Sequence, residues 1–358
     1  MRLTGVRRGI ACLAALALAS GRIPAQPPFG VEARVVQAAV TVTDSKGRAV
    51  TDLRPEEFLL LENGRPRPIT VDTFESGMAP IALVVAVQSS GVSVPALQKI
   101  DRIAGMIQPL VVGAKGCAAV VSFADTVKWE KECTDDPGEI SRGLTAIRPG
   151  DPRKSRMLDA AMQAIERLGQ RPHARRVLLL LSQSRDRGSE TALEQVVRAA
   201  QEAGVSIYAG TYSAFWTSLT EKDGVAPPLP TGMRRSTPGR EEQGAPLRRD
   251  RDPTTPPPEQ RVDLLGAMIE LARLGKINTT EVLTSQTGGL ALSFAKQGAL
   301  ERIIESLGAE LHQQYVLNFT PVESAAGFHP IEVRVLRQGE FKVRTRPGYW
   351  RAAAQQDR

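Results

Sequence analysis

Short apolar runs alternate with amphipathic segments through the middle of the chain. The apolar runs are residues 81–87, 176–181 and 205–209. Runs of this kind are typical of strands that are buried on both faces of a parallel sheet. The segments around them, residues 94–108, 157–168 and 190–203, have the apolar spacing of amphipathic helices. This alternation predicts an α/β domain with a doubly wound, mostly parallel, Rossmann-like sheet.

The two ends of the chain show a different pattern, in which short strand-like segments are separated by turns. Residues 31–77 include an Asn63-Gly64 pair, which is a strong signal for a hairpin turn. Further strand-like segments lie within residues 314–351. Neither end alone has enough strands for independent stability. We therefore expect the two ends to form one small antiparallel β module together.

Two segments are expected to lie outside these folded parts. Residues 1–25 have the features of a signal peptide, because a basic start precedes an apolar run, residues 10–19, that is too short to span a bilayer. Retention of this segment as an anchor is the alternative. Residues 222–262 are rich in proline and charge and poor in apolar residues, which indicates a disordered insertion. The expected organisation is a signal peptide (1–25), the N-terminal part of the β module (26–78), the α/β domain with its insertion (79–312), the C-terminal part of the β module (313–351) and a tail (352–358).

Charge and composition narrow the class of partner. The formal charge of +7 falls to +3 when the signal peptide is removed, because that segment contains four arginines and no acid. Aromatic residues make up only 4% of the chain, so a base-stacking surface is not expected. No stretch of the mature chain is apolar enough to span a membrane. We expect an exported protein, in the periplasm, the cell envelope or the medium, that binds no nucleic acid.

Polar side chains follow the ends of two predicted buried strands. The first strand runs into Gln88-Ser89-Ser90-Gly91-Val92, Gln183 follows the strand at 176–181, and Ser155 lies in a loop between them. This arrangement resembles the von Willebrand factor A domain, in which Asp-x-Ser-x-Ser, a loop Thr and a late Asp hold a divalent cation at the carboxyl ends of the strands. The resemblance implies an adhesion-type binding protein.

The flanking segments extend this resemblance to about residues 31–350. Residues 285–289, Ser-Gln-Thr-Gly-Gly, and residues 314–317, Gln-Tyr-Val-Leu, look like the secreted A-domain-related proteins of acidobacteria.

The metal motif itself is degenerate in this chain. The two aspartates of the family fall on Gln88 and Gln183, and its second serine falls on Val92, so that only the hydroxyls of Ser90 and Ser155 correspond. Mg²⁺ and Ca²⁺ prefer charged oxygen ligands. We therefore expect no tight metal binding, unless Asp186 compensates, and the sequence indicates no other cofactor.

Basic side chains surround these positions. Ligands of open α/β sheets bind at the carboxyl ends of the strands, where a cluster of cations suits a carboxylate, sulfate or phosphate. The alternative is that these are ordinary solvated loop charges paired with acids such as Asp151 and Asp186. The candidate rim residues are Arg153, Lys154, Arg156, Arg185 and Arg187.

Cys117 and Cys133 are the cysteines that remain after the signal peptide. If a hairpin is centred on Asp125, both are eight residues from its centre and face each other. Directly opposed residues are close enough for a disulfide, and an exported protein meets an oxidising compartment. A one-residue error in register would place the two thiols on opposite faces and leave them free.

Three functions remain open at this point. The leading one is a secreted, non-enzymatic protein that binds a protein or an acidic ligand and has lost metal-dependent binding. The first alternative is a structural scaffold or envelope protein that binds through its β module. The second is a hydrolase, which is disfavoured because the chain has three histidines and lacks the glycine that would precede Ser89-Ser90-Gly91 in a nucleophile elbow. The sequence does not indicate an oligomeric state.

Overall fold

The computed structural model describes residues 35–73, 79–91, 97, 101–171, 174–182, 186–211, 266, 268–269, 278–293, 299–322 and 325–351. The predicted signal peptide, the predicted insertion at 222–262 and the tail lie outside these residues. The predicted helix at 262–274 is represented by residues 266, 268 and 269, which are helical. Within the described part of the chain, no helix is long and apolar enough to cross a membrane.

A six-stranded sheet forms the centre of the α/β domain, as the alternation of apolar runs predicts. Its strand order is β10-β9-β8-β5-β6-β7, and all neighbours are parallel except the pair β6 and β7. The strands are β5 (Ile81–Gln88), β6 (Cys117–Phe123), β7 (Val127–Thr134), β8 (Arg175–Ser182), β9 (Val205–Thr211) and β10 (Ala291–Ser293).

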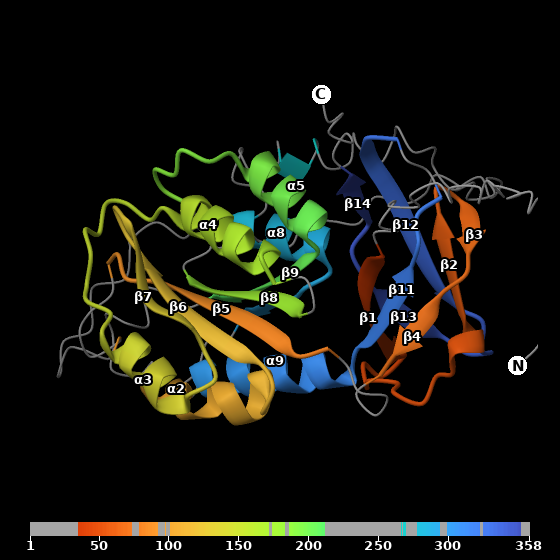
Figure 1. Ribbon diagram of the computed structural model, residues 1–358, viewed down its shortest axis with the longest axis horizontal. Coiled ribbons are helices and arrows are strands. Elements are labelled where there is room, and N and C mark those ends of the chain that lie inside the picture. Colours follow the sequence, from red (N-terminus) through yellow and green to blue (C-terminus); the bar gives the residue numbers. More distant parts are fainter. Residues whose placement is uncertain are drawn as a thin grey trace, which may run out of the picture. The chain divides into compact units, whose positions relative to one another are not determined.

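Helices cover both faces of this sheet (Figure 1). Every residue of β5 is buried: Leu83, Val85 and Val87 pack in the core on one face, and Ala82, Val84 and Ala86 pack in the core on the other. One face carries α2 (Asp101–Ile107), α3 (Pro137–Thr145) and α9 (Ala299–Gln313), and the opposite face carries α4 (Met157–Gly169), α5 (Leu193–Ala203) and α8 (Thr279–Thr287).

The two ends of the chain form a shared antiparallel structure, which confirms the predicted association. They build two four-stranded sheets, β13-β1-β11-β4 and β14-β12-β2-β3, in place of one small module. The N-terminal strands are β1 (Val36–Asp44), β2 (Phe58–Glu62), β3 (Arg65–Arg67) and β4 (Thr70–Asp72), and the C-terminal strands are β11 (Tyr315–Phe319), β12 (Gly327–Val335), β13 (Phe341–Arg344) and β14 (Gly348–Arg351). Each sheet contains strands from both ends.

The inner faces of these two sheets share one hydrophobic core, and we call this part of the molecule the sandwich. Leu60 of one sheet and Leu317 of the other are completely buried in it, and the ring of Phe58 packs edge-on against that of Tyr315. The predicted hairpin between β2 and β3 is present, because Asn63 and Gly64 adopt φ values of 50° and 76°, as a tight hairpin turn requires.

A buried polar network joins the sandwich to the α/β domain. Gln314 is the single residue between α9 and β11. Its Nε2 lies 2.8 Å from the Tyr208 hydroxyl of β9 and 3.1 Å from the Glu310 carboxylate of α9, and its Oε1 accepts a hydrogen bond of 2.8 Å from Arg175 of β8. Burial and the nearby Glu310 raise the pKa of Tyr208 to about 12, so its hydroxyl keeps its proton.

The predicted disulfide between Cys117 and Cys133 is present. Pairing of β6 with β7 follows the expected register near the turn, where Phe123 faces Val127, but two irregularities shift it farther on, so that Ala118 faces Thr134. The two shifts add up to two residues, and side chains alternate between faces with a period of two. The cysteines therefore return to the same face, with their Cα atoms 5.4 Å apart.

Replacing both cysteines by alanine should destabilise the protein. The disulfide joins residues 16 positions apart, and a loop of that length constrains the unfolded chain by about 3 kcal/mol. Urea unfolding of the Cys117→Ala, Cys133→Ala variant should show this loss, and dithiothreitol should lower the midpoint of the unmodified protein but not that of the variant. Equal midpoints for the oxidised and reduced protein would contradict a stabilising role.

Candidate functional site

The carboxyl ends of β5 and β8 meet the loops that the sequence singles out. The order of the strands in the sheet changes direction between β5 and β8. After β5 the chain continues to β6 and β7 on one side of β5, whereas β8, β9 and β10 follow one another on its other side. Such a reversal is the usual ligand position in open α/β sheets. Three segments converge at this edge: residues 88–91, 150–156 and 186–191.

Backbone hydrogen bonds tie these loops to one another. Gly150 N donates to Ser89 O at 3.0 Å, and Arg156 N donates to Ala124 O, at the end of β6, at 2.9 Å. Ser155 and Arg187 exchange two backbone hydrogen bonds, of 2.8 and 2.9 Å. Ser90 bridges to Gly150 and Ser155 to Arg187, so these three segments meet at one edge of the sheet.

Gln88 and Ser90 are brought together in a buried contact. The Gln88 Nε2 lies 3.1 Å from Ser90 Oγ and 3.2 Å from Ser90 O, and both residues are buried. A backbone carbonyl can only accept hydrogen bonds, so the amide NH₂ group of Gln88 must be the group that faces Ser90. The amide therefore supplies a hydrogen-bond donor to an oxygen that would have to face the cation in a metal site.

The donor set at this edge does not fit a hard divalent cation. Gln88 directs an N–H at Ser90, and the part of the chain that the structure describes contains no group of three His, Cys, Asp or Glu side chains placed to hold a metal ion. Ser155 Oγ is buried and has no hydrogen-bond partner among the described residues, but it is a neutral ligand. Val92, Gln183 and Arg185 lie outside the described residues. Carboxylate oxygens contribute most to the affinity for Mg²⁺ and Ca²⁺, and none of the motif positions that the structure describes, Gln88, Ser90 and Ser155, supplies one.

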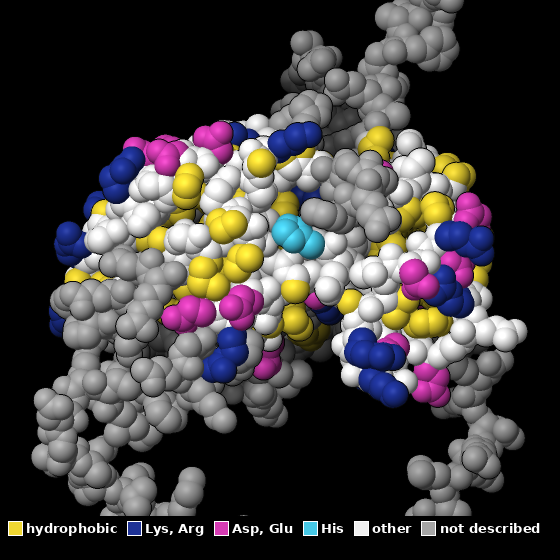
Figure 2. All heavy atoms as spheres, turned by 90° about the horizontal axis from the view of Figure 1, so that it is seen from below, with side chains coloured by type: hydrophobic (Ala, Val, Ile, Leu, Met, Phe, Trp, Pro, Cys, Tyr) yellow, Lys and Arg dark blue, Asp and Glu magenta, His cyan; other side chains and the backbone are white. Residues whose placement is uncertain are grey.

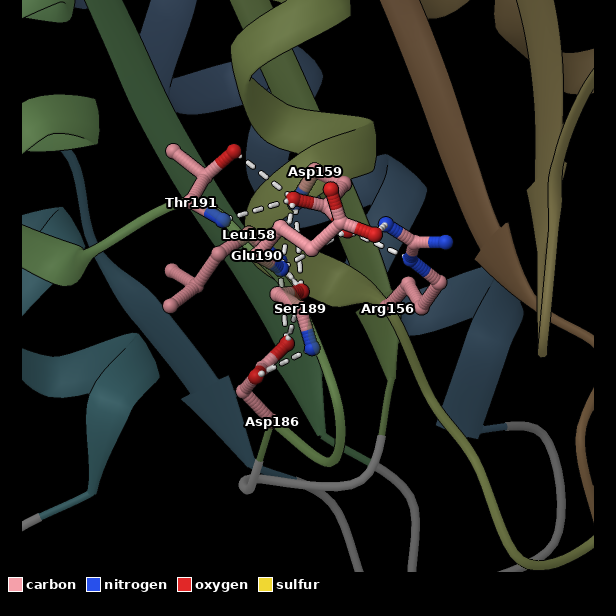
Figure 3. Close-up of polar contacts among 7 residues, drawn as sticks. All are labelled: Arg156, Leu158, Asp159, Asp186, Ser189, Glu190 and Thr191. Carbon is pink, nitrogen blue, oxygen red and sulfur yellow. Dashed lines mark hydrogen bonds and ion pairs between the residues drawn. The ribbon is translucent and has the colours of Figure 1, made fainter.

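Asp186 is engaged in a different way, as the cap of α4 (Figure 3). Its carboxylate accepts hydrogen bonds from Ser189 Oγ at 2.6 Å and from Leu158 N, in the first turn of α4, at 3.1 Å. Ser189 Oγ in turn lies 3.1–3.2 Å from Leu158 N and Asp159 N. These contacts satisfy amides at the start of a helix, where a negative charge is also favourable. The sequence left the role of Asp186 open, and the structure gives its oxygens these partners.

Asp159 organises the rest of the loop cluster (Figure 3). Its carboxylate accepts hydrogen bonds from Thr191 Oγ1 at 2.7 Å, from Thr191 N at 2.9 Å and from Glu190 N at 3.1 Å, and it forms an ion pair with Arg156 at 2.5 Å. Burial alone would raise the pKa of Asp159, but the hydrogen bonds from Thr191, Arg156 and Glu190 outweigh burial and lower it below its ordinary value. The helix predicted from residue 190 begins instead at Leu193, because residues 190 and 191 turn their amides toward Asp159.

Two cations of the predicted basic rim have acidic partners. Arg153 pairs with Asp151 at 3.0 Å, and Arg156 pairs with both Asp159 and Glu190. Lys154 and Arg187 are exposed and form no ion pair with another described residue. A Cβ placed on Gly188 would lie 3.8 Å from Lys154 Cγ, so the lysine stem extends beside the segment that carries Arg187.

One face of the described surface carries charges of both signs. The face formed by α2, α3 and α9, seen in Figure 2, shows Lys and Arg side chains interspersed with Asp and Glu. No broad surface of one sign is visible among the coloured side chains of this view.

The described histidines lie away from this edge. His312 is near the end of α9, where burial and the charge of Arg175 lower its pKa. His329 is buried in β12, stacks on the ring of Tyr349 and contacts Asn63 and Ala325. Neither can act as a base toward Ser90 or Ser155, and His173 lies outside the described residues.

The role of Asp159 in holding the loops together is not apparent from the sequence. A signal was present, because Asp159 is the one acid in the apolar stretch Met157–Ala161 at the start of α4. A carboxylate on a buried helix face must be paired or hydrogen-bonded. The sequence alone does not reveal that its partners lie more than 30 residues later, in the loop before α5.

Comparison with known proteins yields structural similarity only. No protein-family model and no curated protein matches the chain. The conserved hypothetical protein BatB of Bacteroides thetaiotaomicron aligns over 64% of this chain and 97% of its own, with 13% identity and a TM-score of 0.40. An aerotolerance-related membrane protein of Bacteroides fragilis aligns over 64% of this chain and 99% of its own, with 12% identity and a TM-score of 0.38. Proximal thread matrix protein 1 of the mussel byssus, in a form with a zinc-occupied MIDAS motif, aligns over 69% of this chain and 49% of its own, with 14% identity and a TM-score of 0.43.

These similarities assign no ligand to this chain. The chain folds into an α/β protein with a mostly parallel six-stranded sheet and an antiparallel sandwich. At the carboxyl edge of the six-stranded sheet, the metal-motif positions that the structure describes carry amide and hydroxyl groups.

Replacing Asp159 by asparagine should destabilise the fold by about 2–3 kcal/mol at pH 7, because buried N–H donors lose a charged acceptor. The pKa of Asp159 is lower in the folded protein than in the unfolded chain. Its contribution is therefore complete above the unfolded value of about 3.9 and is lost as the pH falls through the lower folded value. The gap in unfolding free energy between the unmodified protein and Asp159→Asn should be constant near neutrality and narrow below about pH 4.

Asp151→Asn is the matched control for this prediction. It removes an exposed carboxylate that pairs with Arg153 in the same loop cluster. Exposed pairs contribute little to stability, so its urea midpoint at pH 7 should equal that of the unmodified protein. A variant Asp159→Asn as stable as Asp151→Asn at pH 7 would show that Asp159 does not organise the loops.

The purified mature protein should show no saturable binding of Mg²⁺, Mn²⁺ or Ca²⁺ at millimolar concentration. A ligand at 100 times its Kd would add about 2.7 kcal/mol, which raises the Tm by roughly 5 °C or more. Thermal unfolding with each metal, compared with EDTA, measures this directly. The variant Gln88→Asp, Val92→Ser, Gln183→Asp is the positive control and should gain a metal-dependent shift. A shift of several degrees in the unmodified protein that is absent in Asp186→Ala would instead assign Asp186 as a ligand.

Proposed function

We propose that this protein is an exported, non-enzymatic binding protein that recognises a protein or another acidic ligand without a metal ion. The binding surface is the carboxyl edge of the six-stranded sheet, formed by residues 150–156 and 186–191. The choice of this edge rests on the observed fold, because ligands of open α/β sheets bind where the strand order reverses.

The observation that carries the proposal is the hydrogen-bond network of Asp159 and Asp186. It fixes two loops whose residues lie about 30 positions apart in the sequence, and the backbones of Ser155 and Arg187 are joined directly. Loops that are already ordered lose little entropy on binding. Lys154 and Arg187 extend from this fixed backbone into solvent, where cations favour an acidic partner and increase the rate of encounter.

The absence of a metal requirement follows from the same residues. Where an adhesion motif would use a cation to attract a carboxylate, this edge has neutral Gln88 and Ser90 facing each other. Positive charge is provided by Lys154 and Arg187 on the exposed side of the loops. An acidic group can pair directly with such side chains, with charge-assisted hydrogen bonds to the guanidinium.

Two features oppose a hydrolase. Ser90 Oγ is buried and receives the Gln88 amide, which cannot act as a base. The described histidines belong to the end of α9 and to the sandwich. The scaffold alternative, with binding through the sandwich, is best tested in the full chain, because deleting the α/β domain would also remove Tyr208 and Glu310 from the network around Gln314.

The decisive experiment is site-specific photocrosslinking on the envelope of the producing cell. A photoreactive phenylalanine analogue replaces Pro152, an exposed residue of the loop 150–156, in one variant and Lys342, an exposed residue of the sandwich edge strand β13, in the other. The Pro152 variant, which keeps Lys154 and Arg187, should give a discrete adduct that is unchanged by EDTA and weakened by salt. An adduct only from the Lys342 variant would support the scaffold alternative, and loss of the adduct in EDTA would contradict metal-independent binding.

A charge reversal measures the contribution of the exposed cations. Arg187→Glu should weaken the affinity for the crosslinked partner by roughly tenfold, equivalent to about 1.4 kcal/mol. Arg198→Glu, an equal reversal on the exposed side of α5, is the control and should leave the affinity unchanged. Equal affinities for both variants and the unmodified protein would exclude the carboxyl edge as the binding surface.

A further inference from the structure

A hollow lies beside the end of α4, which packs over β5 and β6 (Figure 1), toward the amino ends of these strands. Its volume is about 210 Å³, which gives room for one aromatic ring, since an enclosed cavity of about 150 Å³ accommodates benzene. Ala82, Ala119 and Leu168 form part of its inner wall and are only 2–3% exposed. Its rim is open to solvent, because Glu132 and Arg171 are exposed. A ligand therefore contacts mainly the side chains of the rim.

Arg167, in the last turn of α4, holds its guanidinium at this rim. The guanidinium lies over the ring of Trp129 on β7, 3.7 Å from the ring centroid, and forms an ion pair with Glu132. Trp129 is held in turn by a hydrogen bond of 3.1 Å from its Nε1 to Gln163 Oε1 on α4. The Arg167 side chain remains 41% exposed. A guanidinium stacks on aromatic faces, so a second ring can stack on Arg167 from the solvent side.

Arg171 supplies a second positive charge at the hollow. It follows the end of α4, is exposed, and forms no ion pair with another described residue. The charged residues that line the hollow are two arginines and one glutamate, and Glu132 is already paired with Arg167. The hollow therefore favours an anionic ligand. A carboxylate can accept two parallel hydrogen bonds from a guanidinium such as that of Arg171.

We propose that this hollow binds a small aromatic carboxylic acid, whose ring stacks on the Arg167 guanidinium and whose carboxylate pairs with Arg171. The contacts among Trp129, Arg167 and Glu132 order the stacking surface before the ligand binds, and the disulfide ties the adjacent Cys133 to β6. Such preorganisation reduces the entropy lost on binding. The hollow lies at the end of α4, whereas the carboxyl edge lies at its start, so this site does not depend on the proposed function.

Titration of the oxidised mature protein with phenylacetate tests the proposal, with calorimetry and the NMR signals of the tryptophan indoles as readouts. For an acid of this size we expect saturable binding with a Kd of about 1 mM. Phenylacetamide lacks the charge and acetate lacks the ring, and each should bind at least about tenfold more weakly. The Trp129 indole signal, identified by its loss in Trp129→Phe, should shift during the titration, and that of Trp350 in the sandwich should not.

Exposed arginines provide the variants that locate the site. Arg171→Gln removes the charge proposed to hold the carboxylate, and Arg167→Met removes the stacking guanidinium while keeping an apolar side chain beside Trp129. Each should weaken phenylacetate binding at least about tenfold. Arg187→Gln is the matched control at the carboxyl edge and should leave the affinity unchanged.

Three results would overturn the proposal. The first is the absence of saturable phenylacetate binding to the unmodified protein. The second is equal affinity for phenylacetate and phenylacetamide, because the charge would then play no part. The third is an affinity that is lost in Arg187→Gln and kept in Arg171→Gln, which would place the acid at the carboxyl edge instead.

Discussion

The side-chain amide of Gln314 occupies a position on which the arrangement of the two folded parts depends. It is the only residue between α9 and β11, so the direction of the helix fixes the first residue of a sandwich strand. Its nitrogen and oxygen are bonded to groups from β9, α9 and β8. A buried amide must satisfy both its donors and its acceptor, and the observed placement of β8, β9 and α9 does so for Gln314. The pairing of β11 with β1 and β4 then fixes where the N-terminal strands lie.

A second polar network performs the corresponding task at the carboxyl edge. Asp159 and Asp186 both lie at the carboxyl edge of the sheet, and their oxygens accept hydrogen bonds from hydroxyls and amides of the loop before α5 and from an amide in the first turn of α4. Through these hydrogen bonds, the carboxylates of Asp159 and Asp186 hold the loops in place. The loops at this edge thereby gain rigidity, while Gln88, Ser90 and Ser155, the metal-motif positions that the structure describes, carry no charged oxygen. That combination is why direct recognition by Lys154 and Arg187 is the function we favour.

The two ends of the sheet differ in the sign of their buried charges. At the carboxyl edge, buried acids are paired with hydrogen-bond donors, and the unpaired cations are in solvent, where their charge costs little. At the junction with the sandwich, Arg175 and Arg346 are themselves buried. The low dielectric of that region strengthens the hydrogen bonds that Arg346 and Arg175 donate to carbonyl oxygens.

The sequence by itself determined the alternation of β5, β6, β8 and β9 with helices, because strands buried on both faces need uninterrupted apolar residues. It also determined the Asn63-Gly64 turn, where few residues adopt positive φ. It indicated the disulfide between Cys117 and Cys133, but not the two register shifts that leave these cysteines on one face without placing them directly opposite each other. Only the tertiary structure decided that the ends of the chain form two sheets rather than one module, because that choice depends on pairings between residues more than 250 positions apart. The roles of Asp159 and Asp186 and the burial of Arg346 among backbone carbonyls have the same origin. The partners of a buried charge are brought to it by folding, and composition and spacing do not specify them.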